Sequence, residues 1–241
     1  MNKILKLVFL VIVIISVFLI YKSTNNKYLN YTSIGDGLSK GIDSYGNIDY
    51  GYSDYIYDYL KGNDLLKLYS KDFTSQEMSI NDLKNMILLD EKVNYKNRKI
   101  NLKNILSESD ILTMSIGLND LIYKMSILDT TSISKTDKIV DETYNEFTIL
   151  IDEIKKYYNK DIYLIGYYTS TKYGYKVNYA IEKLNEKYKK DQSITYIATD
   201  YFLNNNKKYL PNPNSYYPNS YGYQAISRKI IVKITKKLEN S

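Results

Sequence analysis

The first hydrophobic feature of the chain is an uninterrupted apolar run near its start. Residues 7–21 read LVFLVIVIISVFLIY without a charge, and Lys3 and Lys6 precede them. With the two apolar residues before Lys6 included, the run approaches the lower limit of about 17 residues for a membrane-spanning helix. We predict an uncleaved N-terminal transmembrane helix, with residues 1–27 forming the membrane anchor and a short linker and residues 28–241 forming the folded domain.

A cleaved secretory signal peptide is the alternative for this segment. Signal cleavage favours small residues before the cut, and the sequence Tyr21-Lys22-Ser23 supplies them poorly. Lys22 and Lys27 follow the apolar run and weaken the positive-inside bias, which makes the orientation less certain than the anchor. We predict a single-pass protein of the cell membrane whose globular domain is extracytoplasmic.

From residue 28 onward, short apolar runs alternate with amphipathic stretches. Four runs have the length and composition of buried strands, and the first three each end at a glycine. The amphipathic stretches place apolar residues at steps of three and four, which is typical of helices. The predicted strands cover residues 28–34, 111–116, 162–165 and 194–198, and the clearest predicted helices cover residues 140–158, 177–188 and 225–234.

Strands that alternate with helices indicate right-handed crossovers and a mainly parallel sheet covered on both faces. Ser79 and Asp82 have the spacing of a capping box and predict the start of a further helix. In such a sheet, ligands bind at the carboxyl ends of the strands. Three loops at these ends contain unusual polar residues, at 35–39, 117–120 and 211–223.

Four segments of the chain, in order, resemble the sequence blocks of the SGNH (GDSL-type) hydrolases. The resemblance implies a flavodoxin-like three-layer α/β/α sandwich with a mainly parallel sheet. It also implies hydrolysis of esters such as lipids, small acyl esters or acetylated sugars. The matching segments are IGDGLSKG at 34–41, DILTMSIGLNDL at 110–121, IYLIGYY at 162–168 and LPNPNSYYPNSYGYQAI at 210–226.

The resemblance also places the family's catalytic triad, and this chain departs from it at every member. The nucleophilic serine falls on Gly37, the aspartate on Ser215 and the histidine on Tyr217. The chain contains no histidine or cysteine, which excludes Ser-His-Asp and Cys-His catalysis. A tyrosine, with a pKa of about 10, is a weak replacement for imidazole.

Two functions follow from these departures. We predict a catalytically impaired pseudo-hydrolase that binds an acyl-ester or cell-envelope glycan ligand, or a protein partner. The alternative is an active GDSL-type esterase or lipase in which Ser39, the hydroxyl nearest to Gly37, acts as a displaced nucleophile.

Four further residues stand at retained positions of the family's site. In relatives, the positions of Gly117 and Asn119 help to hold the oxyanion, and Asp36 and Asp120 accompany them. We predict that these four residues line a substrate pocket. Each also has a structural interpretation, because glycines permit tight turns and Asp36 can cap a helix. Asn119 and Asp120 can likewise hold a loop through bonds to the backbone.

The amino-acid composition excludes several kinds of site and several classes of binding partner. Without cysteine there is no disulfide or zinc-thiolate site, and the carboxylates between residues 43 and 58 do not follow a calcium-binding loop. We predict no metal and no cofactor. The net charge of +6 favours anionic envelope polymers or lipid head groups. The chain lacks an arginine-rich stripe, and we predict no binding to nucleic acid.

Overall fold

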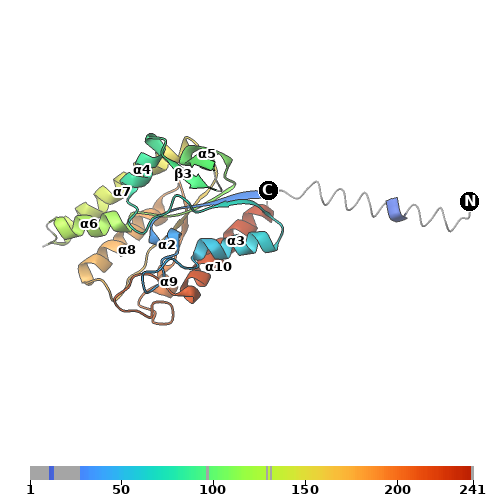
Figure 1. Cartoon of the computed structure of the whole chain (residues 1–241). Coiled ribbons are helices and arrows are strands. Elements are labelled where there is room, and N and C mark those ends of the chain that lie inside the picture. The colour runs from blue at the N-terminus through green and yellow to red at the C-terminus, as the bar shows by residue number, and fades with distance from the viewer. Residues whose placement is uncertain (1–10, 14–27, 96–97, 129, 131, 240–241) are drawn as a thin grey trace, which may run out of the picture.

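The computed structural model describes most of the chain after residue 27. The described residues are 11–13, 28–95, 98–128, 130 and 132–239 (Figure 1). The predicted anchor at residues 7–21 lies outside them, apart from the three helical residues 11–13. Within the described ranges, no helix is both long enough and apolar enough to cross a membrane.

The centre of the domain is a five-stranded sheet in the order β2-β1-β5-β6-β7, in which every neighbouring pair is parallel. Strand β1 pairs with β5 from Tyr31 opposite Ile111 to Gly35 opposite Ser115. The loops after β1 and β5, which carry residues 35–39 and 117–120, therefore leave the sheet side by side. The strands are β1 Leu29–Gly35, β2 Leu66–Ser70, β5 Ile111–Ser115, β6 Ile162–Ile165 and β7 Thr195–Ile197.

Helices cover both faces of this sheet and confirm the three-layer arrangement. On one face α3 Tyr52–Gly62 lies beside α10 Ser220–Glu239, and on the other α7 Ile133–Lys155 lies between α4 Ile80–Leu88 and α8 Tyr175–Lys190 (Figure 1). The remaining elements are α2 Gly37–Lys40, α5 Leu102–Glu108, α6 Leu118–Ile127, α9 Asp200–Leu203 and a small antiparallel hairpin of β3 Lys92–Tyr95 and β4 Arg98–Asn101.

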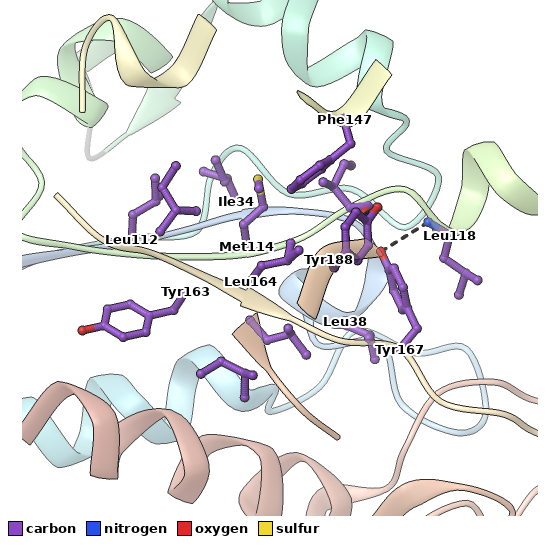
Figure 2. Close-up of a cluster of buried hydrophobic side chains, with 14 of the residues drawn as sticks. Ile34, Leu38, Leu112, Met114, Leu118, Phe147, Tyr163, Leu164, Tyr167 and Tyr188 are labelled. Atoms are coloured by element: carbon purple, nitrogen blue, oxygen red, sulfur yellow. Dashed lines mark hydrogen bonds between the residues drawn. The ribbon is translucent and has the colours of Figure 1, made fainter. Parts of the chain in front are cut away.

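The inner strands are buried on both faces, and this explains their nearly continuous apolar sequences. All residues of β5 and β6 are buried. Leu112, Met114 and Leu164 lie with Ile34 in the middle of the sheet, and Phe147 approaches them from α7 (Figure 2).

The four predicted strands are confirmed to within about two residues at each end, and the predicted capping box begins α4. There the Ser79 hydroxyl accepts from the Asp82 amide, and the Asp82 carboxylate accepts from the Ser79 amide. Strand β2 and the β3–β4 hairpin were not predicted. β2 lies at the sheet edge, where Lys67 and Leu68 are exposed, so its sequence lacks the signal of a buried strand.

Candidate functional site

The site begins where β1 passes closest to β5. Gly35 has a φ of 114°, and a Cβ atom on it would overlap the carbonyl oxygen of Ser115, so only glycine fits without rearrangement. The next residue, Asp36, caps α2 by accepting from the Leu38 amide at 3.1 Å. The glycine and the cap together place Gly37 in the first turn of α2, at the carboxyl edge of the sheet.

Asp36 lies inside the protein, with 4% of its surface exposed. Its Oδ1 accepts from the Ser115 hydroxyl at 2.5 Å, and its Oδ2 accepts from the Tyr167 hydroxyl at 2.5 Å. Burial raises the pKa of Asp36, and these hydrogen bonds partly oppose the rise. Asp36 therefore joins α2 to the ends of β5 and β6, which is the capping role foreseen for it.

Two of the triad positions meet in space. A Cβ atom placed on Gly37 would lie 2.6 Å from both Cε1 and Cζ of Tyr217, and closer still to its hydroxyl. Non-bonded carbon atoms are normally about 3.5–4.0 Å apart. The Tyr217 ring therefore fills the volume that a side chain at position 37 would need. Burial raises the pKa of the Tyr217 hydroxyl above its usual value, so even less phenolate is present at neutral pH to accept a proton.

The third triad position lies beside the second. The Ser215 hydroxyl accepts from the Tyr217 amide at 3.2 Å, and the Ser215 amide donates to the carbonyl of Asn212. Ser215 thus shapes the turn that presents Tyr217, and it is partly exposed.

Asn119, in the first turn of α6, uses its amide within the fold. Its Nδ2 donates to the carbonyl oxygens of Gln76 and Met78, each at 3.0 Å. A side-chain amide has two N–H groups, so these two bonds use all its donors. Asn119 therefore ties α6 to the loop before α4, which is the loop-holding interpretation of this residue.

Gly117 and the following amide are also enclosed. Gly117 has a φ of 109°, and a Cβ atom on it would collide with the hydroxyl of Tyr188. The Leu118 amide donates to the Tyr167 hydroxyl at 3.3 Å (Figure 2). Tyrosine hydroxyls thus approach the turn after β5 from the segment that follows β6 and from α8.

Asp120 lies at the edge of a cavity that is separate from the Gly37 position. Both of its carboxylate oxygens accept from the Ile80 amide, at 3.1 and 3.0 Å, and burial raises its pKa to about 6. Asn119 and Asp120 line a cavity of about 480 Å³ together with residues of α4, α6 and α7. Asp36 and Gly117 do not line this cavity, so the four predicted pocket residues do not share one space, and Gly37 and Tyr217 do not line it either.

Ser39, the predicted alternative nucleophile, is fully buried. Its hydroxyl lies 2.7 Å from the hydroxyl of Tyr52 and 2.7 Å from that of Ser115, and it accepts from the Ser115 amide at 3.1 Å. These partners surround the Ser39 hydroxyl between α2, β5 and α3, and it does not reach the surface. Sequence reasoning missed this hydroxyl cluster because Ser115 and Tyr52 are ordinary residues of a strand and a helix.

Among the described residues, no three acidic side chains are grouped so as to hold a metal ion. The site therefore consists of neutral hydroxyls and amides around one buried carboxylate, Asp36.

No protein-family model matches the sequence, and no curated protein matches it. Solved structures do match the fold. The lipase Lip_vut3 from a goat rumen metagenome is 18% identical with a TM-score of 0.65, over 85% of this chain and 96% of that one. An acetylxylan esterase from Geobacillus stearothermophilus is 15% identical with a TM-score of 0.57, over 87% and 95%.

A member of the lipolytic G-D-S-L family from Veillonella parvula is 12% identical, with a TM-score of 0.53 over 86% of this chain and 98% of that one. Sequence identities this low show a shared fold and no more. The parallel strand order agrees with that fold, as do the positions of the four segments that resemble the family. The chain therefore has the SGNH-type hydrolase fold.

Proposed function

We propose that this protein is a pseudo-hydrolase: a membrane-anchored SGNH-fold protein that binds a ligand or partner without hydrolysing esters. The observation that carries the proposal is the contact between Tyr217 and Gly37. Ester hydrolysis by a covalent route needs a nucleophile and an adjacent base. Here glycine supplies no nucleophile, and the residue at the histidine position occupies the nucleophile's volume.

The hydrogen-bond donors at the family's oxyanion position support the same proposal. Stabilising the charge of a tetrahedral intermediate requires donors aimed at the developing oxyanion, and the loss of one typically lowers kcat by about 100- to 1,000-fold. Asn119 is the side-chain donor retained at the family's position, and its two N–H groups already bond to Gln76 and Met78. Enclosure of Ser39 among Tyr52 and Ser115 gives no support to a displaced serine.

The apolar run at residues 7–21 supports anchoring in the cell membrane, with the domain on the extracytoplasmic side. An acyl-ester or glycan ligand fits that location. Structural relatives are named as a lipase and an acetylxylan esterase, which act on those two classes of molecule. The ligand class of this chain is part of the proposal.

The test is ester hydrolysis by the full chain in detergent micelles, with p-nitrophenyl acetate and acetylated xylan as substrates. We expect no rate above that of buffer with micelles. Ser39→Ala is measured beside the wild type. Turnover by a folded wild-type sample that disappears in Ser39→Ala would overturn the proposal in favour of a relocated nucleophile.

A further inference from the structure

The cavity beside Asp120 is separate from the blocked Gly37 position. Its volume of about 480 Å³ lies within the usual range of roughly 300–1,000 Å³ for small-molecule sites. The first half of α4 forms one wall, the first half of α6 forms the other, and Glu146 of α7 contributes between them. Three helices of the fold therefore shape this space, and it does not depend on a surface loop alone.

The cavity is lined by three charged side chains that form no ion pair with a described residue: Glu77, Asp120 and Lys84. The Asp120 carboxylate accepts from the Ile80 amide but forms no ion pair within the described part of the chain. The nearby Lys124 ammonium is engaged with Glu146 at 2.6 Å. Lys84, on the α4 wall, makes no ion pair or hydrogen bond with a described residue. The half-buried carboxylate of Asp120, the exposed carboxylate of Glu77 and the ammonium of Lys84 thus line one cavity without ion-pair partners among the described residues.

The charges of the lining suggest what the cavity would hold. The carboxylates of Asp120 and Glu77 suit an ammonium, and Lys84 on the α4 wall suits a carboxylate. A small molecule that carries both charges therefore matches the lining of the cavity.

We infer that the cavity between α4, α6 and α7 is a binding site for a small zwitterionic molecule such as a short peptide, with its ammonium at Asp120 and its carboxylate at Lys84. Asn81 also lines the cavity and offers its side-chain amide to the ligand, and Asn119 offers its Oδ1 as an acceptor. Tyr123 stands at the same wall with 64% of its surface exposed and offers an aromatic face to a small side chain. The inference goes beyond the loss of hydrolysis and does not require it.

The test is calorimetric titration of the full chain in micelles with L-alanyl-L-alanine as the probe. N-acetyl-L-alanyl-L-alanine lacks the ammonium, and L-alanyl-L-alaninamide lacks the carboxylate, so these two probes remove one charge each. Lys84→Met and Asp120→Asn remove the matching charges of the protein. Asn at position 120 keeps an oxygen for the Ile80 amide, so this variant retains the bond that holds α4. Lys138→Met is the matched control, on an exposed part of α7 outside the cavity.

We expect saturable binding of L-alanyl-L-alanine, and a loss of about tenfold or more in affinity for either modified probe and for either cavity variant, since a tenfold change needs only about 1.4 kcal/mol. Lys138→Met should bind as the wild type does. Absence of saturable binding by the folded wild type would overturn the inference. Equal binding by Lys84→Met, or equal binding of the N-acetylated probe, would overturn it as well. None of these results depends on esterase activity, so the proposed pseudo-hydrolase is tested separately.

Discussion

The ring of Tyr217 occupies the space directly over Gly37, and the two residues exclude any side chain at position 37. These are the positions at which the family resemblance places the base and the nucleophile. The two departures from the family are therefore complementary in size: the Tyr217 ring fills the volume that a side chain at position 37 would occupy. A serine at position 37 would require Tyr217 to move.

The contact between Tyr217 and Gly37 can be tested by a double-mutant cycle. Gly37→Ala should lower the free energy of unfolding by about 1–3 kcal/mol, because the added methyl group overlaps the Tyr217 ring. In a Tyr217→Ala background the same change should be neutral or stabilising, since alanine is favoured over glycine in a helix by roughly 0.5–1 kcal/mol. Urea unfolding of the four proteins measures the coupling.

Gly62 is the control for that cycle, because a Cβ atom there meets nothing within 4 Å. Gly62→Ala should have the same effect in both backgrounds. An equal effect of Gly37→Ala in the two backgrounds would contradict the packing described for Tyr217.

Asn119 offers a test of its loop-holding role. Asn119→Ala leaves the carbonyls of Gln76 and Met78 without their donor and should cost about 1–3 kcal/mol of stability. Asn119→Asp should cost more, since it brings a carboxylate against two carbonyl oxygens. Exposed Asn145→Ala on α7 is the control and should stay within about 0.5 kcal/mol. If Asn119→Ala is as mild as the control in urea unfolding, the two hydrogen bonds do not hold the loop.

Two fully buried tyrosines should respond oppositely to removal of the hydroxyl. Tyr167 donates to the Asp36 carboxylate, and hydrogen bonds to charged groups contribute about 1.5–3 kcal/mol, so Tyr167→Phe should be destabilising by that amount. The Tyr216 hydroxyl is buried with no hydrogen-bond partner in the described structure. Tyr216→Phe should therefore be neutral or stabilising. Thermal unfolding at neutral pH compares the two, and a similar loss in both would show that Tyr216 has an unrecognised partner.

The raised pKa of Asp120 predicts the direction in which the stability of the protein changes with pH. Its pKa rises from 3.8 to about 6 in the folded protein, so the folded state binds the proton more tightly than the unfolded state. Its contribution to stability is full below about pH 3.8, falls as the pH rises to about 6, and is constant above that. The stability of the wild type minus that of Asp120→Asn should decline across this window in urea unfolding from pH 4 to pH 7. A difference that increases with pH would mean that Lys124 or another cation governs the carboxylate.

Much of the fold was predictable, because the inner strands are buried on both faces and therefore carry continuous apolar runs. This applies to residues 111–116 and 162–165, each ended by a glycine. Edge strand β2 escaped prediction because its side chains are mostly half-exposed or exposed. The assignment of Gly37, Ser215 and Tyr217 to the triad positions rests on the family resemblance and stays a prediction, although the structure does bring Gly37 and Tyr217 together.

The sequence by itself determined which chemical groups are missing: a chain without histidine or cysteine has no imidazole or thiolate in any conformation. Tertiary structure alone decided what the remaining groups do, because side chains far apart in sequence meet only after the strands pair. It directs the Asn119 amide to two loop carbonyls and buries Ser39 against Ser115 and Tyr52. It also places Asp120 at a cavity that Gly37 does not line. Finally, it places the Tyr217 ring, 180 positions later in the sequence, in the space beside Gly37.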